Sequence, residues 1–225
     1  MKPLFLLAVF PVVLMGWMSC SRSGTGHAAL PDPRTVDKSV PEYKNPFHPS
    51  TYAHFVARKD YRKTYDVYKD DTLLNRQPKK SRKIFVCLDE QRGQYLVDGL
   101  VAMDFPLSSG VKAYPTKTGD YAVISKKEDH TSNLYGKMYD AEGKCINYNA
   151  ESTDPVPEGG RFDGSPMPYW QRLTNAGLGL HVGKVRRHPV SHGCVRLPRN
   201  VAEILYRQTS IGTPVTIQKT PLPVS

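Results

Sequence analysis

The segment HVGKVRRHPVSHGCVRLP, residues 181–198, gathers ionisable side chains around a single thiol. It contains His181, His188, His192 and Cys194, together with four arginine or lysine residues. A free cysteine has a pKa of about 8.5 and is only a few per cent thiolate at neutral pH, so a catalytic cysteine needs a base or a positive field nearby. This segment supplies both, which makes Cys194 a candidate nucleophile.

The same residue types also bind zinc, so a metal site is one alternative. Pro189 interrupts any helix that would place His188 and His192 on one face, and no second cysteine lies close in the sequence. We therefore expect no metal here, and we interpret His188 as an exposed loop residue. A third alternative is a basic loop that contains an inert buried thiol.

Strand periodicity predicts the geometry around the thiol. In an extended strand the side chains of His192, Cys194 and Arg196 lie on the same side. Gly193 leaves the backbone beside the thiol open, so the amides of Gly193 and Cys194 can form an oxyanion hole for a substrate carbonyl. We expect His181 to come from the preceding strand and to reach a position opposite Cys194 through a hairpin-like return.

The elements that must position these residues are predicted to be short strands. From Lys83 onwards, apolar segments of roughly four to seven residues alternate with Gly or Asp turns, which is typical of an antiparallel sandwich or barrel. The strand candidates are KIFVCLDE, GQYLVDG, LVAMDFPLSSG, TGDYAVISKK, LGLHVG, CVRL and TPVTIQ. Residues 140–168 are polar and rich in Gly and Pro, and they are predicted to form a long loop.

One helix is predicted over NVAEILYRQ, residues 200–208. Asn200 is the expected N-cap, and Glu203 at the third helical position would complete a capping box. The expected apolar face consists of Val201, Ile204 and Leu205. A second candidate helix within residues 51–76 would dock on the main domain.

The length and composition of the chain indicate one sizeable globular domain with extensions. The chain has 225 residues, 39% of them hydrophobic, and a formal net charge of +10. This excess of positive charge favours acidic partners such as nucleic acid, anionic lipid or an anionic cell-wall polymer.

The first residues favour export. Residues 3–18 are apolar and uncharged, a length typical of a secretory signal and short for a membrane span of roughly 20 residues. Small residues flank Cys20, and the pattern resembles a bacterial lipoprotein signal, with residues 1–19 removed and Cys20 lipidated as the new N-terminus. Ordinary secretion and an uncleaved anchor are the alternatives. All three place the protein in the cell envelope, which argues against nucleic acid as the partner.

The predicted organisation behind this signal has three parts. Residues 20–82 form a basic linker and N-terminal extension, residues 83–219 the main domain, and residues 220–225 a tail. In an oxidising compartment Cys87 and Cys145 could form a disulfide, or both could be buried free thiols.

The sequence SHGCVRL with an upstream His-Val-Gly resembles the catalytic signature of the L,D-transpeptidases, the YkuD-type domain. YPTKTGDYAV, residues 114–123, and MPYWQRL before GLGLHVG are similar to further segments of that family. The resemblance covers roughly residues 83–219 and implies a mainly β fold, an antiparallel sandwich or barrel-like domain with one or two short helices. Many members have His-Gly-Thr where this chain has His181-Val182-Gly183, and the 13-residue gap to Cys194 is short.

The resemblance also implies roles for the site residues. His181 would be the general base and Cys194 the nucleophile, while His192 would position or polarise the site. Arg196 would hold the loop or a substrate carboxylate. The further candidates are Ser191, orienting an imidazole through its carbonyl, and Tyr169 and Trp170, lining the substrate site or the core.

The implied activity is an acyl transfer on peptidoglycan stem peptides. Cys194 would attack the carbonyl of the third, diamino acid residue of a tetrapeptide stem, release D-alanine and form a thioester that an amine of a neighbouring stem converts into a cross-link. With water as acceptor the enzyme would be an L,D-carboxypeptidase or another peptidoglycan hydrolase. A non-catalytic wall-binding lipoprotein is the remaining alternative. No cofactor or metal is implied, and the expected partners are stem peptides and, through Cys20, the membrane.

Overall fold

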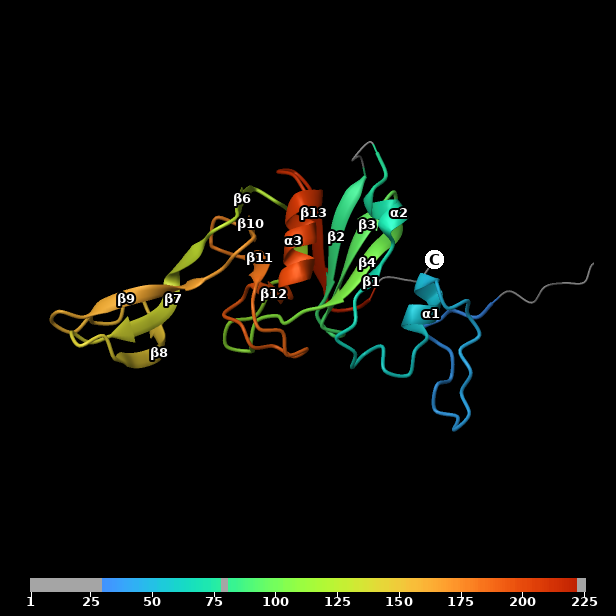
Figure 1. Cartoon of the computed structure of the whole chain (residues 1–225), viewed down its shortest axis with the longest axis horizontal. Helices are drawn as coiled ribbons and strands as arrows, with labels where there is room; N and C mark the ends of the chain where they lie inside the picture. Colours follow the sequence, from blue (N-terminus) through green and yellow to red (C-terminus); the bar gives the residue numbers. More distant parts are fainter. Residues whose placement is uncertain (1–29, 78–80, 222–225) are drawn as a thin grey trace, which may run out of the picture. The chain divides into compact units, whose positions relative to one another are not determined.

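The computed structural model describes residues 30–77 and 81–221, and Pro31–Ser225 forms one compact unit (Figure 1). Cys20 and the predicted signal peptide, residues 1–19, lie outside the described residues, and so do the last four residues of the predicted tail. Within the ranges described, none of the helices is both long and apolar enough to cross a membrane.

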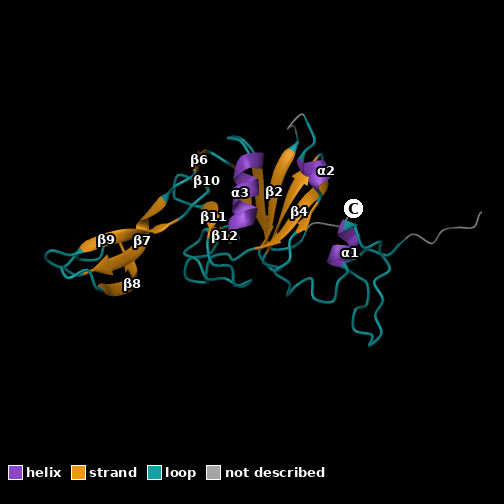
Figure 2. Ribbon diagram, viewed as in Figure 1, coloured by secondary structure: helices purple, strands orange, loops and turns teal. Residues whose placement is uncertain are grey.

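Strands dominate the regular structure, and the helices are few and short (Figure 2). The described residues contain three sheets and three helices, which confirms the mainly β prediction. The helices are α1 (Tyr52–Val56), α2 (Asp71–Leu74) and α3 (Arg199–Gln208).

The largest sheet has six strands in the order β1-β4-β3-β2-β13-β5. Its strands are β1 (Tyr68–Lys69), β2 (Arg82–Cys87), β3 (Arg92–Val97), β4 (Leu100–Pro106), β5 (Gly119–Ala122) and β13 (Pro214–Gln218). β13 pairs with β2 in parallel, although its pairing with β5 and most other pairings are antiparallel. The sheet is therefore mixed rather than purely antiparallel, because the chain returns to it through α3 instead of through a tight turn.

A second sheet of four strands carries the segment around the predicted site. Its order is β12-β11-β10-β6, with β6 (Ser125–Lys127), β10 (Trp170–Arg172), β11 (Gly179–Val182) and β12 (Val195–Leu197). Leu180, Val195 and Leu197 are fully buried in the same core as side chains of the six-stranded sheet. One face of the four-stranded sheet thus packs on the core, and the opposite face carries residues of the predicted site.

The third sheet has the order β8-β7-β9, with β7 (Thr131–Tyr139), β8 (Cys145–Glu151) and β9 (Arg161–Pro166). The prediction of a long loop over residues 140–168 is therefore wrong. Gly164 was an indicator of a loop, but in the structure it lets two strands approach: a Cβ on Gly164 would lie 1.9 Å from the carbonyl oxygen of Ser132. Glycine at a close contact between strands looks the same in the sequence as glycine in a turn.

α3 packs its apolar side against the core, with Val201, Ala202 and Leu205 fully buried. The predicted capping box is absent: the helix starts after Pro198, and no side chain caps its N-terminus. Pro198 occupies the N-cap position with a φ of −57° and a ψ of 147°, so the helix begins at Arg199 and Asn200 lies inside its first turn. Glu203 instead pairs with Arg207, one turn later, at 2.5 Å.

A buried charge joins the N-terminal segment to the six-stranded sheet. Asp104 in β4 is fully buried and accepts hydrogen bonds from Arg92 Nε at 2.5 Å, from the Tyr52 hydroxyl at 2.7 Å and from the Tyr61 hydroxyl at 2.8 Å. Tyr52 lies in α1, so the helix expected within residues 51–76 is present and docks on the domain. Residues of the predicted N-terminal extension thus supply partners for a core carboxylate.

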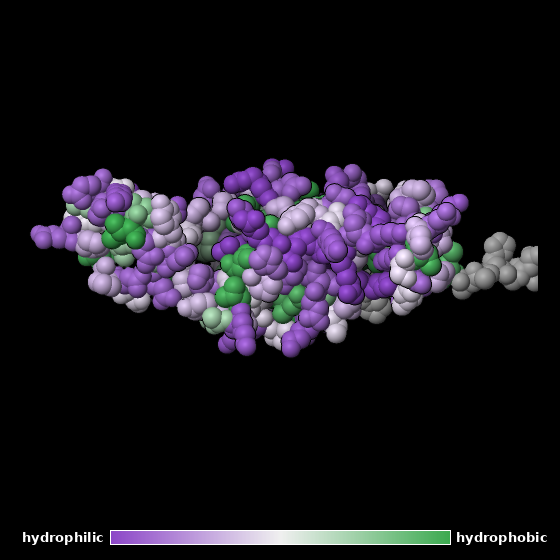
Figure 3. Space-filling model, turned by 90° about the horizontal axis from the view of Figure 1, so that it is seen from below, coloured by the Kyte–Doolittle hydropathy of each residue, from purple (hydrophilic) through white to green (hydrophobic). Residues whose placement is uncertain are grey.

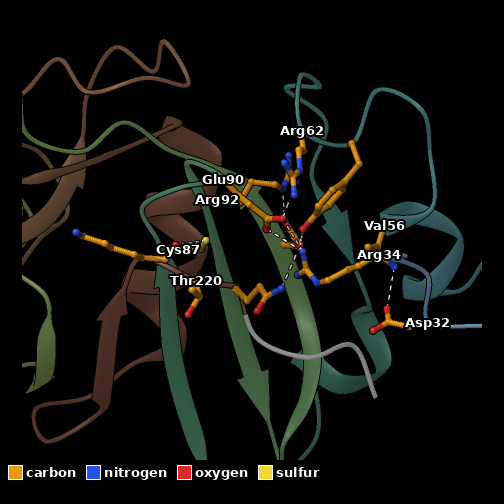
Figure 4. Close-up of polar contacts among 12 residues, drawn as sticks. Asp32, Arg34, Val56, Arg62, Cys87, Glu90, Arg92 and Thr220 are labelled. Carbon is orange, nitrogen blue, oxygen red and sulfur yellow. Dashed lines mark hydrogen bonds and ion pairs between the residues drawn. The ribbon is translucent and has the colours of Figure 1, made fainter. Parts of the chain in front are cut away.

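A second ion pair lies beside this cluster (Figure 4). Arg34 donates two hydrogen bonds to the buried carboxylate of Glu90, at 2.7 and 2.9 Å, and Arg62 approaches the same carboxylate at 3.8 Å. Lys38 donates to the carbonyl of Val56 at 2.7 Å. Residues 31–66 are therefore held by specific polar contacts.

Of the three cysteines that the structure describes, Cys87 and Cys145 lie outside the segment around Cys194, and both are free. Cys87 is buried and its thiol donates to the Lys219 carbonyl at 3.0 Å, whereas Cys145 lies partly exposed in β8. Burial raises the pKa of Cys87 to about 11, so its thiol is protonated at neutral pH. Of the two alternatives, the structure thus has free thiols and no disulfide between Cys87 and Cys145.

On the face shown in Figure 3 most residues are hydrophilic, and hydrophobic ones form small separate patches. The apolar side chains of the strands instead lie buried in the core. Its largest fully buried aliphatic and aromatic side chains are Ile84, Phe85, Tyr95, Met103, Phe105, Leu107, Leu180, Leu197, Leu205 and Ile217.

We expect Asp104→Ala to lower the free energy of unfolding by about 3–5 kcal/mol, because it leaves the Arg92 guanidinium buried without its counter-charge. Urea denaturation followed by circular dichroism measures the change. Asp163→Ala is the matched control, since Asp163 makes an exposed ion pair with Arg161 at 3.4 Å and such pairs contribute about 0–1 kcal/mol. Equal stability of the two variants would contradict the importance of the buried cluster.

Candidate active site

The register of the four-stranded sheet brings the predicted residues together. His181 in β11 is paired directly with Arg196 in β12, and Leu180 is paired with Val195. Because Leu180 and Val195 point into the core, His181 and Arg196 share the opposite face. Cys194 immediately precedes β12, two residues before Arg196.

These residues line one cleft with a volume of about 590 Å³. The predicted residues in its wall are His181, Ser191, His192, Gly193, Cys194, Arg196 and Trp170. Tyr169 is not among the lining residues: it packs on the core and against Tyr206, with ring centroids 5.6 Å apart. Of the two aromatic candidates, the structure places only Trp170 at the cleft.

The imidazole of His181 is buried and held in one orientation. Its Nδ1 lies 2.8 Å from the carbonyl oxygen of Val182. A carbonyl can only accept, so Nδ1 carries the proton and Nε2 is left as an acceptor. Burial lowers the pKa of His181 to about 4, the Val182 bond opposes this effect, and the positive charge of Arg196 adds to it. At neutral pH His181 is thus a neutral imidazole that can accept a proton.

The thiol of Cys194 is also largely buried, and it donates to the carbonyl of Gly177 at 3.3 Å. Burial raises its pKa above the usual value, while the backbone at Gly179 and the charge of Arg196 act in the opposite direction. The resting pair is therefore a thiol and a neutral imidazole rather than a thiolate and an imidazolium. Such a site activates its nucleophile by transferring a proton to the base during attack.

Residues 191–194 form a tight turn rather than a strand. Gly193 has a φ of +111°, which strongly favours glycine, and its amide donates to the Ser191 hydroxyl at 3.2 Å. The predicted oxyanion role of the Gly193 amide therefore requires that this bond be exchanged for one to the substrate. The Thr116 hydroxyl donates to the Gly193 carbonyl at 2.6 Å and fixes the turn from the other side.

Ser191 does not orient an imidazole through its carbonyl, because that carbonyl accepts from the Val111 amide at 3.0 Å. The carbonyl that holds the His181 ring belongs to Val182. Ser191 instead closes the turn through its side chain: its hydroxyl donates to the Cys194 carbonyl and accepts from the Gly193 amide.

His192 lies away from the predicted position. Because β12 begins only at Val195, His192 is not on a strand with Cys194, and the expectation of a shared strand face is wrong. Its ring stacks on Tyr135 of β7 at 4.3 Å and contacts Tyr114 at 4.8 Å, measured between ring centroids. The turn that carries the thiol is thus packed against the third sheet.

Arg196 lies over the backbone of Gly183, where a Cβ would approach its Cγ to 2.7 Å. The glycine of the His-Val-Gly sequence therefore makes room for the arginine. The described residues include no hydrogen-bond or ion-pair partner for the Arg196 guanidinium, although the side chain is half-buried and lines the cleft.

The connection from His181 to Cys194 is a crossover and not the predicted hairpin, since β11 and β12 are parallel. Arg187, in the middle of this loop, has a φ of +57° and donates to backbone carbonyls of two other segments. The acceptors are the carbonyls of Tyr61, Arg62, Thr64 and Glu90. The short loop is thus held by contacts outside its own sheet.

Several cleft residues were not identified from the sequence. Gly177, Tyr135 and His130 line the cleft but belong to no motif that the sequence analysis identified. Tyr114 and Thr116, which contact His192 and Gly193, were noted solely within the YPTKTG resemblance. His130 stacks on Trp170, with ring centroids 5.2 Å apart. No local signal marks these residues, because they reach the site only through tertiary packing.

Three of the residues considered as metal ligands, His181, His192 and Cys194, line the cleft, whereas His188 does not. His188 is exposed, with Nδ1 3.3 Å from the Pro189 carbonyl, and His192 is stacked between tyrosines. Over residues 30–77 and 81–221 no three His, Cys, Asp or Glu side chains are grouped as a metal site requires. The expectation of a metal-free enzyme stays a prediction.

Comparison with known proteins gives concordant matches. Residues 81–217, more than half of the chain, match the YkuD family model, described as the L,D-transpeptidase catalytic domain. Probable L,D-transpeptidase 3 from Mycobacterium tuberculosis is 32% identical over 121 residues, which make up 51% of this chain and 38% of that relative. The chain thus matches well under half of the length of this curated relative.

Solved structures with the same description are also similar. An L,D-transpeptidase from Mycobacterium smegmatis aligns with a TM-score of 0.47 and 22% identity, over 61% of this chain and 58% of that one. The catalytic domain of the Enterococcus faecium L,D-transpeptidase aligns with a TM-score of 0.45 and 28% identity, over 62% of this chain and 98% of that domain.

We expect alkylation of Cys194 by iodoacetamide to keep accelerating as the pH rises past 9, because only the thiolate reacts and burial raises its pKa. Peptide mass spectrometry of Cys87→Ser/Cys145→Ser protein quenched at intervals measures the rate at each pH. A rate that is already at its plateau near pH 6 would show instead that Cys194 rests as a thiolate paired with a charged histidine.

Proposed function

Because the chain belongs to the YkuD L,D-transpeptidase catalytic-domain family, we propose that it is an exported, lipid-anchored L,D-transpeptidase that joins peptidoglycan stem peptides through a Cys194 thioester. The observation that carries the proposal is that the Cys194 thiol and a neutral His181, whose Nδ1–H is bonded to Val182, line the same cleft. A thiol and an oriented neutral base in one cleft are the groups that nucleophilic acyl transfer requires.

The first half-reaction forms the thioester. His181 Nε2 accepts the thiol proton as the sulfur attacks the carbonyl of the third residue of a tetrapeptide stem. The bond between this carbonyl and the nitrogen of the terminal D-alanine breaks, and the leaving nitrogen takes the proton from His181. D-alanine departs as the free amino acid.

The second half-reaction transfers the acyl group. An amine of a neighbouring stem attacks the thioester and gives a proton to His181, and the Cys194 sulfur leaves and is reprotonated. The thioester conserves the energy of the cleaved amide bond, so the proposed cycle needs no metal or organic cofactor.

The main test is mass spectrometry of the products formed by the purified protein from a disaccharide-tetrapeptide. A cross-linked dimer with loss of one D-alanine supports the transpeptidase. A tripeptide alone identifies an L,D-carboxypeptidase on the same scaffold. An unchanged substrate with no acyl-enzyme would leave a non-catalytic wall-binding protein.

We expect Cys194→Ala to abolish acylation, whereas Cys87→Ser and Cys145→Ser retain it. His181→Ala should reduce the acylation rate by about 10²–10⁴-fold, the usual contribution of a general base. His192→Ala should keep a measurable rate, because its ring is engaged with Tyr135. Intact-protein mass spectrometry during reaction with the stem or a carbapenem follows acylation. An inactive His192→Ala beside an active His181→Ala would mean that the base is misassigned.

Export and anchoring rest on the uncharged apolar residues 3–18 and on Cys20. We expect the intact mass of the protein extracted from membranes to correspond to a chain that begins at an acylated Cys20. Cys20→Ala should release the protein from the membrane fraction. A soluble mature chain that begins at another residue would contradict lipidation and leave the enzymatic proposal intact.

A further inference from the structure

The cleft around Cys194 is lined by basic side chains without acidic ones. Its lining contains Lys117, Arg172 and Arg196 and includes no aspartate or glutamate of the described residues. Glu151 lies near this region, but its carboxylate contacts the Tyr114 hydroxyl, at 3.4 Å, and no arginine. The positive charge of the cleft is therefore left without compensation by the protein.

Two of these cations are partly buried and yet lack partners. Over the ranges that the structure describes, neither Arg172 nor Arg196 has a hydrogen bond or an ion pair to its guanidinium. The buried Arg92, by contrast, is paired with Asp104. No guanidinium nitrogen of Arg172 or Arg196 is among the fully buried atoms without a partner, so these groups are accessible to an anion that enters the cleft.

The sheet register places the two arginines on the two sides of β11. Arg172 in β10 is opposite Gly179, and Arg196 in β12 is opposite His181. Residues 179 and 181 lie on the same face of β11, so both arginines face the cleft. They are two strands apart, on the order of 10 Å between backbones, and Cys194 lies beside them.

This spacing suits an anionic peptide that lies across the thiol. A stem peptide has one carboxylate just beyond the bond that the enzyme cuts and further carboxylates on the second and third residues. Guanidinium groups bind such carboxylates with paired, charge-assisted hydrogen bonds, which a carboxamide cannot accept to the same extent. The carboxylates of the second and third residues would therefore find a cation each.

We infer that Arg172 and Arg196 are specificity-determining residues that recognise free carboxylates of the donor stem, so that the enzyme selects stems with unmodified carboxyl groups over amidated ones. The inference rests on the proposed function and names the substrate class of the same cleft. Room for Arg196 is provided by Gly183, whose missing side chain lets the arginine lie over the backbone.

The test compares two synthetic tetrapeptide stems that differ only in the carboxyl groups of residues two and three, free in one and amidated in the other. Binding to Cys194→Ala protein is measured by calorimetry, and acylation of the unmodified site is measured by mass spectrometry. We expect the free stem to bind at least about 10-fold more tightly, the scale of one charge-assisted hydrogen bond. Its affinity should fall with added salt more steeply than that of the amidated stem.

Arg172→Gln and Arg196→Gln, each in the Cys194→Ala background, should reduce the preference for the free stem to within about twofold, and the charge-retaining Arg196→Lys should recover part of it. Arg161→Gln is the matched control, because Arg161 lies in β9, is exposed and pairs with Asp163 at 3.4 Å. Circular dichroism establishes that each variant is folded. The preference should be unchanged in Arg161→Gln.

Equal binding of the two stems, or tighter binding of the amidated stem, would overturn the inference. A preference that persists in both glutamine variants would overturn the assignment to these arginines. Failure of the proposed function is distinguishable, because it would appear as the absence of any acyl-enzyme from either stem, whatever their relative affinities for the Cys194→Ala protein.

Discussion

A carboxylate in the core of the six-stranded sheet determines how the rest of the molecule is assembled. Asp104 is fully buried, and an unpaired charge there would be prohibitive, so Arg92, Tyr52 and Tyr61 must converge on it. The two tyrosines bring the N-terminal segment onto the sheet. Its backbone carbonyls at residues 61–64 then accept hydrogen bonds from Arg187 of the loop that joins His181 to Cys194. Through this chain of contacts a buried charge supports the catalytic loop.

Burial also sets the protonation states of the candidate site. It disfavours the charged form of each group, so it lowers the pKa of His181 and raises that of Cys194. Both effects favour the neutral pair, in which the histidine can accept a proton and the thiol can give one. The unpaired charge of Arg196 favours a thiolate, but in the resting site it does not outweigh burial.

The third sheet contributes to the site through aromatic packing. Tyr135 of β7 stacks on His192, and the Thr116 hydroxyl fixes the same turn through Gly193. The turn that carries the thiol is therefore held by two other segments of the chain, around Thr116 and Tyr135. A substitution at Tyr135 would reach the nucleophile through His192 without touching it directly.

The sequence by itself determined the mainly β fold, the apolar face of α3 and the concentration of His181, Cys194 and Arg196 in one short segment. Each of these follows from local spacing, because alternation in a strand, helical periodicity and a short motif are all encoded by neighbouring residues. The parallel pairing of β11 with β12 and the strands within residues 140–168 were decided by tertiary structure. So was the placement of His192 against Tyr135 and Tyr114. The reason is that strand register, close approach of glycines and hydrogen-bond partners depend on residues distant in the chain, whose meeting only the packed core specifies.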